Sequence, residues 1–116
     1  MKLEISDGKL KIDLGDLGKV LVIRGSFEIP LDHILKVGTE AHRSGWAETR
    51  VPATHVIGAT KAGVYNTPRG MELWYVTEKG VLVLELEDEL YKRIVLSIDR
   101  NEEWAERIRK AIGKFR

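Results

Sequence analysis

Apolar residues recur at every second position through most of this chain of 116 residues. The stretches over residues 2–5 and 9–14 alternate strictly between polar and apolar side chains. Successive side chains of a β-strand point to opposite faces, so a period of two is typical of strands that bury one face. We therefore expect a mainly β protein with strands over about residues 2–98.

Turn-forming residues separate these strands. Asp7-Gly8 supplies the positive φ angles that a two-residue hairpin turn requires, so the chain is predicted to open with a hairpin. Thr67-Pro68-Arg69-Gly70 suits a type I turn with a left-handed exit. Glu78-Lys79-Gly80 turns the strand over residues 71–77 into the strand over residues 81–86. We expect about seven short antiparallel strands in all.

The period changes at Asp99. Apolar side chains then recur at spacings of three and four, which places them on one stripe of a helix: Trp104, Ile108, Ala111, Ile112 and Phe115. Acidic residues near the start of this segment and basic residues near its end suit the two ends of a helix dipole. We predict an amphipathic helix over about residues 100–115 that caps the open end of a small β-barrel.

The length fits one domain over residues 1–116. Nineteen Lys and Arg residues against 18 Asp and Glu give a formal net charge of +1. A nucleic-acid-binding domain usually carries a net basic charge, so no nucleic-acid partner is expected. Gln is absent while Glu, Lys and Arg are abundant, as on the surfaces of thermophilic proteins.

The chain contains no cysteine, which excludes a disulfide scaffold, a thiolate zinc site and a cysteine nucleophile. No apolar run approaches the ~20 residues of a transmembrane helix. The first residues alternate between polar and apolar and include Glu4, unlike a signal peptide. We therefore expect a cytoplasmic protein without a transmembrane segment.

Seven strands followed by a capping helix is the architecture of pleckstrin-homology-like (PH-like) domains. The chain resembles small uncharacterised prokaryotic proteins with that fold over four stretches, residues 29–37, 52–65, 71–76 and 81–108. The shared features are an Ile-Pro-Leu step, a glycine-bearing strand, an aromatic strand and a Tyr-x-Arg strand that runs into the final helix. This resemblance implies a split barrel, and the group has no agreed activity.

Many PH domains bind phosphoinositides through Lys and Arg in the loop between their first two barrel strands. The corresponding loop here is residues 13–18, which holds Asp13 and Asp16 and no basic residue. Like charge would repel a phosphate at this loop, so the sequence disfavours phosphoinositide binding there.

No catalytic residue, metal ligand or cofactor is predicted. The histidines at positions 33, 42 and 55 lack the spacing of metal ligands, although the adjacent Asp32 could orient the imidazole of His33. The serines lack the context of a nucleophile elbow. The sequence therefore favours a protein that is not an enzyme.

The irregular segment over residues 38–53, together with the following lysine, is the best candidate for a ligand-binding region. Basic residues interleaved with an aromatic residue can hold an anionic ligand by charge and stacking. The alternative is a solvated loop whose tryptophan packs on the edge of the barrel. The candidate ligand-binding residues are His42, Arg43, Trp46, Arg50 and Lys61.

These observations favour a non-catalytic binding or scaffold module that engages a partner protein through an exposed strand edge or the groove beside the helix. Two alternatives stay open. One is a small enzyme or a flavin or nucleotide carrier of the split-barrel type, and the other is a binder of anionic ligands or lipid headgroups. Free strand edges also allow a symmetric homo-oligomer.

Overall fold

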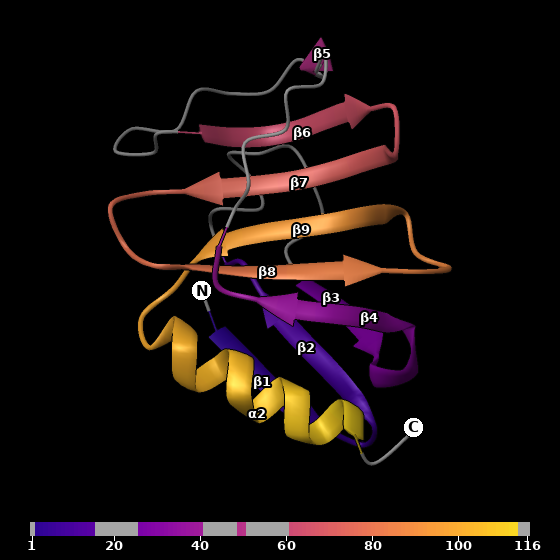
Figure 1. Cartoon of the computed structure of the whole chain (residues 1–116), viewed down its shortest axis with the longest axis vertical. Coiled ribbons are helices and arrows are strands. Elements are labelled where there is room, and N and C mark those ends of the chain that lie inside the picture. Colours follow the sequence, from indigo (N-terminus) through magenta and orange to yellow (C-terminus); the bar gives the residue numbers. More distant parts are fainter. Residues whose placement is uncertain (1, 16–25, 41–48, 51–60, 114–116) are drawn as a thin grey trace.

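The computed structural model describes residues 2–15, 26–40, 49–50 and 61–113, with the backbone alone for Thr49, Arg50 and Lys61. It contains two β-sheets and one C-terminal helix (Figure 1). The elements in chain order are β1 (Lys2–Ser6), β2 (Lys9–Asp13), β3 (Ser26–Pro30), the 3-10 helix η1 (Leu31–His33), β4 (Ile34–Gly38), β5 (Thr49–Arg50), β6 (Lys61–Thr67), β7 (Gly70–Val76), β8 (Val81–Leu86), β9 (Tyr91–Ser97) and α2 (Asn101–Gly113).

The first sheet has three antiparallel strands in the order β1-β2-β3. Asp7 and Gly8 join β1 to β2 with φ angles of 54° and 72°, which confirms the predicted opening hairpin. Alternate residues of β2, Leu10 and Ile12, are almost fully buried, whereas the lysines between them lie toward solvent. The strict alternation in this part of the sequence thus corresponds to one buried and one solvated face.

The second sheet has six strands in the order β4-β8-β9-β7-β6-β5. The hairpin predicted at residues 67–70 is present between β6 and β7, and Gly70 has a φ angle of +129°. The prediction of antiparallel strands throughout is wrong at one place, because β9 lies between β7 and β8 and pairs with β7 in parallel. Residues 77–80 therefore cross the end of β9 and do not form a hairpin turn.

Hydrogen bonds explain this crossing. The Ser97 hydroxyl accepts a hydrogen bond from the Thr77 N–H at 2.8 Å and donates one to the Lys79 carbonyl at 3.2 Å. The Ile98 N–H donates to the Gly80 carbonyl at 3.0 Å. In a hairpin, the backbone groups of residues 77–80 would form hydrogen bonds with each other. Here residues 97 and 98 of the chain provide their partners. The chain does reverse direction at residues 78–80, as predicted, but the strand that pairs with β7 is β9 and not β8.

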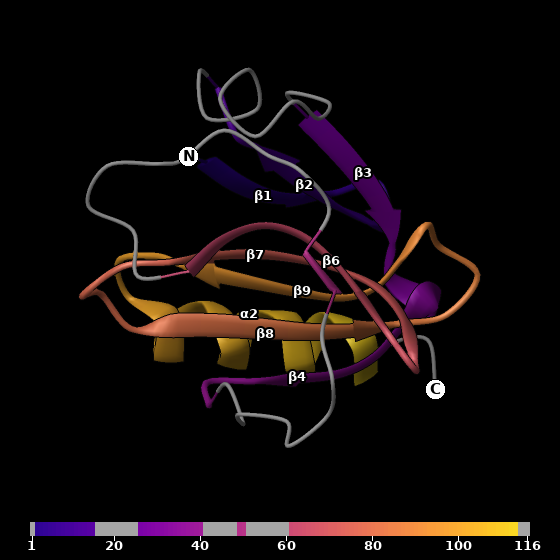
Figure 2. The same ribbon diagram turned by 90° about the horizontal axis from the view of Figure 1, so that it is seen from above.

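The core lies between the two sheets and α2, which packs against β4 and β8 (Figure 2). The helix buries Ala105, Ile108 and Ile112, and Trp104 is half-buried at its first turn. A C-terminal helix close to the predicted bounds is confirmed, while Phe115 lies outside the described residues. Among the described elements, none is a helix long and apolar enough to cross a bilayer.

The predicted class, mainly β with one C-terminal helix, is confirmed. Nine strands are present in the described residues, against about seven expected. The two sheets share no strand pairing there and are not closed into a barrel. The short helix η1 is followed directly by β4, so β3 and β4 are joined without an irregular loop.

Candidate functional site

Of the five predicted ligand-binding residues, the structure describes two, and these by their backbone alone. Arg50 lies on β5 opposite Tyr65 of β6, and Lys61 begins β6. Tyr65 and Lys61 are four positions apart on one strand, about 13 Å, so the backbones of Arg50 and Lys61 are not brought together. The other three predicted residues lie outside the described residues: His42, Arg43 and Trp46.

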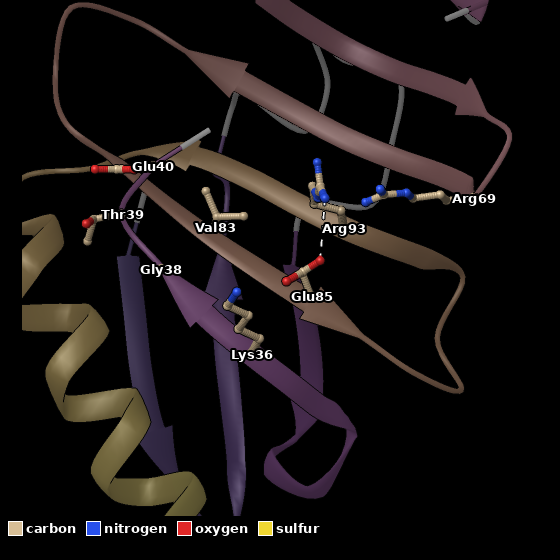
Figure 3. A pocket seen from close by; sticks show the side chains of 8 residues that line it. All are labelled: Lys36, Gly38, Thr39, Glu40, Arg69, Val83, Glu85 and Arg93. Carbon is tan, nitrogen blue, oxygen red and sulfur yellow. Dashed lines mark hydrogen bonds and ion pairs between the residues drawn. The ribbon is translucent and has the colours of Figure 1, made fainter. Parts of the chain in front are cut away.

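Two concave surfaces lie among the described residues. The first, here called the cationic pocket, is a hollow of about 370 Å³ on the outer face of the six-stranded sheet, the face turned away from the core (Figure 3). Residues from β4 and the two positions after it, from β8 and β9, and from the β6–β7 turn line it: Lys36, Gly38, Thr39, Glu40, Arg69, Val83, Glu85 and Arg93.

The strand periodicity places the cationic pocket on this outer face. On β8, Leu82 and Leu84 point into the core, so Val83 and Glu85 point to the other side. Arg93 lies opposite Glu85 in the β8–β9 register, and its guanidinium Nη2 lies 3.4 Å from the Glu85 carboxylate. Regular strands thus hold three of the charged groups of the pocket in place, those of Lys36, Glu85 and Arg93.

A buried carboxylate lies on the same face. Glu72 of β7 is 4% exposed and accepts a hydrogen bond from the indole N–H of Trp74 at 2.9 Å. The Thr67 hydroxyl donates to the other carboxylate oxygen at 3.4 Å. Trp74 packs with Tyr65 and Val95 in a second apolar cluster. Because Glu72 is used in holding this cluster, it has a structural role.

The second concave surface, here called the edge groove, measures about 450 Å³ and lies between β3 and the start of β9. Its lining combines one strand edge with the β8–β9 turn: Ser26, Phe27, Glu28, Ile29, Leu86, Glu89, Leu90, Tyr91 and Ile94. β3 pairs with β2 along one edge, and within the described ranges no strand pairs with its other edge.

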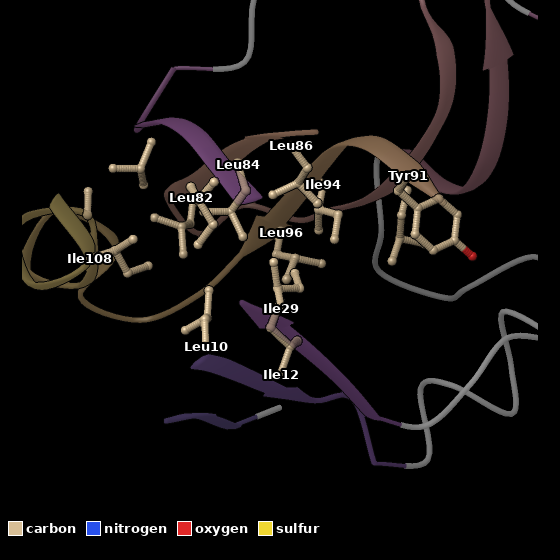
Figure 4. Packing of buried hydrophobic residues seen from close by; sticks show 14 of the residues in the cluster. Leu10, Ile12, Ile29, Leu82, Leu84, Leu86, Tyr91, Ile94, Leu96 and Ile108 are labelled. Atoms are coloured by element: carbon tan, nitrogen blue, oxygen red, sulfur yellow. The ribbon is translucent and has the colours of Figure 1, made fainter. Parts of the chain in front are cut away.

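Aromatic and aliphatic side chains form the apolar part of the edge groove. The rings of Phe27 and Tyr91 meet edge to face, with centroids 5.9 Å apart and an interplanar angle of 79°. Figure 4 shows the Tyr91 hydroxyl pointing away from the aliphatic cluster that contains Ile29 and Ile94. Burial of this tyrosine raises the pKa of its hydroxyl above the usual value of 10.0, because the ionised form would lose solvation.

The rim of the edge groove is acidic and carries one exposed leucine. Leu90 is 68% exposed. Glu89 contacts His33 Nδ1 at 3.4 Å, and Glu28 contacts Lys9 Nζ at 3.7 Å. Both contacts are partly or largely solvated, so they contribute little to stability and leave the carboxylates accessible.

The described residues contain side chains of the types that bind metal ions, His, Asp and Glu. Within them, no three His, Asp or Glu side chains are arranged to hold a metal ion. Sequence reasoning missed Arg93, Glu85 and Leu90 as candidate site residues. The available signal was the alternation along these two strands, which places Glu85 and Arg93 on the same face as Val83 and Val95.

Comparison of the chain with protein-family models, with curated proteins and with solved structures found no match. The structure alone therefore classifies the chain, as a two-sheet β protein with a C-terminal helix. The resemblance to PH-like proteins stays a prediction.

Proposed function

We propose that this protein is a non-catalytic binding module that takes up an extended segment of a partner protein along the free edge of β3. The observation that carries the proposal is the position of the edge groove, which opens directly beside that edge. A free edge presents backbone N–H and C=O groups that an added strand can pair with, and adjacent pockets select its side chains.

The edge groove suits the side chains of such a strand. Every second residue of an added strand points to the same side, so alternate side chains would enter the groove and contact Phe27 and Tyr91. Leu90 on the rim offers an exposed apolar contact that burial would stabilise. Aromatic side chains in a partly buried pocket are typical anchors of protein interfaces.

Charge gives the partner a second property. Glu28 and Glu89 lie on the groove, and exposed Glu87 and Asp88 occupy the adjoining turn. An acidic rim attracts basic residues and repels acidic ones. The proposed occupant is therefore an extended segment with alternating apolar residues and with Lys or Arg beside them.

The proposal includes the PH-like relationship and the cytoplasmic location expected from the sequence. The order of the elements supports the relationship, since small β-sheets are followed by one amphipathic C-terminal helix packed on the core. Two features differ from the antiparallel split barrel expected of a PH-like domain. The two sheets are separate in the described residues, and β7 and β9 are parallel.

The test uses two short acetylated peptides, one alternating lysine with valine and one alternating glutamate with valine, titrated into the isotope-labelled protein. We expect the lysine peptide to shift the NMR amide signals of residues 26–29 and 89–91, and the glutamate peptide to leave them unchanged. Equal binding of both peptides, or no shift in these residues, would contradict the proposal.

A variant pair ties the binding to the edge groove. Leu90→Ala is expected to weaken binding of the lysine peptide at least about tenfold, as loss of an interface anchor does. Leu35→Ala is the matched control, because Leu35 is also exposed, at 46%, and does not line the groove. A dimer that forms without peptide and is lost in Leu90→Ala would instead identify a second copy of the chain as the occupant.

A further inference from the structure

The cationic pocket is separate from the edge groove, since no residue lines both. Three basic side chains and two carboxylates line it, so cations outnumber anions. Its volume of about 370 Å³ falls within the range of small-molecule sites. The peptide-binding function proposed above does not use this surface.

Arg93 is the central group of the pocket. Its side chain is only 13% exposed, and its partner within the described residues is Glu85, through one contact of 3.4 Å. A guanidinium has five N–H donors in a fixed plane, so this single contact leaves several donors available. Glu72 lies opposite Arg93 in the β7–β9 register, and its two oxygens accept hydrogen bonds from Trp74 and Thr67. An arginine that is held by cross-strand pairing and has more donors than its one carboxylate contact uses is suited to bind an oxyanion.

Two further cations come from separate elements. Figure 3 shows the guanidinium of Arg69, on the β6–β7 turn, extending toward Arg93. Lys36 of β4 lies on the other side of Glu85, and it has no ion-pair partner in the part of the chain that the structure describes.

The remaining lining leaves room for the rest of a ligand. Val83 is an apolar contact, and Gly38 has no side chain. A Cβ atom added at Gly38 would meet no atom within 4 Å. The space beside Gly38 is therefore open, and a larger side chain at this position can be accommodated without displacing its neighbours.

We propose that the cationic pocket binds a small ligand through a phosphate monoester held between Arg93 and Arg69, with Lys36 as an additional cation. Glu85 already gives Arg93 one carboxylate, so a dianion balances the two guanidinium groups better than a second carboxylate does. The oxygens of a phosphate accept hydrogen bonds from both arginines at once. Soluble phosphate esters and the headgroup of phosphatidic acid share this chemistry.

The test is an NMR titration of the isotope-labelled full chain at constant ionic strength with glycerol phosphate, and with glycerol and acetate as controls. We expect saturable shifts of amide signals in residues 36–40, 83–85 and 93 with glycerol phosphate alone. Sedimentation with phosphatidylcholine vesicles, with and without phosphatidic acid, distinguishes the two sources. Binding in either arm supports the proposal, and no saturation below about 10 mM together with no vesicle binding overturns it.

Three variants locate the site. Arg69→Gln is expected to raise the Kd about fivefold or more, as loss of one charged hydrogen-bonding group does. Lys110→Gln, the matched charge control, lies on α2 on the opposite side of the six-stranded sheet and should leave the Kd unchanged.

Gly38→Val fills the open space and should abolish binding while the protein stays folded, judged by its guanidinium unfolding midpoint. Wild-type affinity in Gly38→Val, or equal losses in Arg69→Gln and Lys110→Gln, would overturn the proposal. Arg69→Gln keeps the test decisive if Gly38→Val does not fold, because Arg69 is exposed on a turn.

Discussion

The hydroxyl of Ser97 accepts a hydrogen bond at 2.8 Å from the backbone N–H of Thr77, twenty residues earlier in the chain. The same hydroxyl donates to the Lys79 carbonyl, so one buried side chain holds both ends of the link that passes over β9. This serine fixes the arrangement in which β9 separates β7 from β8.

Replacing Ser97 by alanine should lower the free energy of unfolding by about 1–3 kcal/mol, because the Thr77 N–H and the Lys79 carbonyl would lose their partner in a largely buried place. Guanidinium denaturation measures the loss. Ser26→Ala, at an exposed serine, is the control and should stay within about 0.5 kcal/mol of wild type. A loss for Ser97→Ala no larger than that of the control would show that the hydroxyl does not hold the link.

Glu72 should tolerate an isosteric change better than truncation. Glu72→Ala removes the acceptor of the Trp74 indole N–H, and we expect it to cost about 2 kcal/mol of unfolding free energy. Glu72→Gln keeps an oxygen at the same distance and should cost clearly less. Chemical denaturation followed by tryptophan fluorescence compares the two. Equal losses would indicate that the carboxylate charge, and not the hydrogen bond, matters.

Stability should fall at alkaline pH through Tyr91. Burial raises the pKa of this hydroxyl in the folded state, so above about pH 10 the unfolded chain releases a proton that the folded chain retains. The contribution of Tyr91 is therefore fully present below pH 10.0, the usual tyrosine pKa, and is lost as the pH rises through the folded value.

Tyr91→Phe is the matched variant, since it retains the ring that contacts Phe27. Urea unfolding at a series of pH values should show the wild type losing stability relative to Tyr91→Phe above about pH 10. Parallel curves for the two proteins across that range would contradict the assignment.

The C-terminal helix should contribute strongly to stability through Ile108, which is fully buried in the main core. Ile108→Ala is expected to cost about 2–5 kcal/mol, as truncation of a buried aliphatic side chain does. Lys110→Ala, on the exposed side of the same helix, should change stability by less than about 0.5 kcal/mol. Thermal unfolding of both variants tests this, and a loss below about 1 kcal/mol for Ile108→Ala would show that the helix packs only loosely.

Local patterns predicted the local structure well. Asp7-Gly8 and residues 67–70 marked two hairpins that are present, and the change of period at Asp99 marked the helix. Residues 78–80 correctly marked a reversal of the chain, but they did not show which strand lies beside β7. That strand is β9, and its pairing with β7 depends on contacts between residues far apart in sequence, such as the one between Thr77 and Ser97. Sheet order is a property of the whole chain, which turn chemistry alone does not encode.

The candidate sites were harder to predict for a related reason. Basic residues were sought in the irregular segment, where functional side chains often gather. The cationic pocket instead joins Arg93, Arg69 and Lys36 from three elements, and each of these residues looks like an ordinary solvated charge in its own stretch of sequence. The order of the strands and the position of the β6–β7 turn bring them to one face.

The place of β9 has a consequence for how the protein is made on the ribosome. β7 and β8 are synthesised first, yet they lie two strand spacings apart, about 10 Å, with β9 between them. A nascent chain that has not yet reached Tyr91 therefore lacks the strand that joins the two halves of the six-stranded sheet. The sheet is completed from its middle, and the nascent protein keeps two inner strand edges open until that last strand emerges.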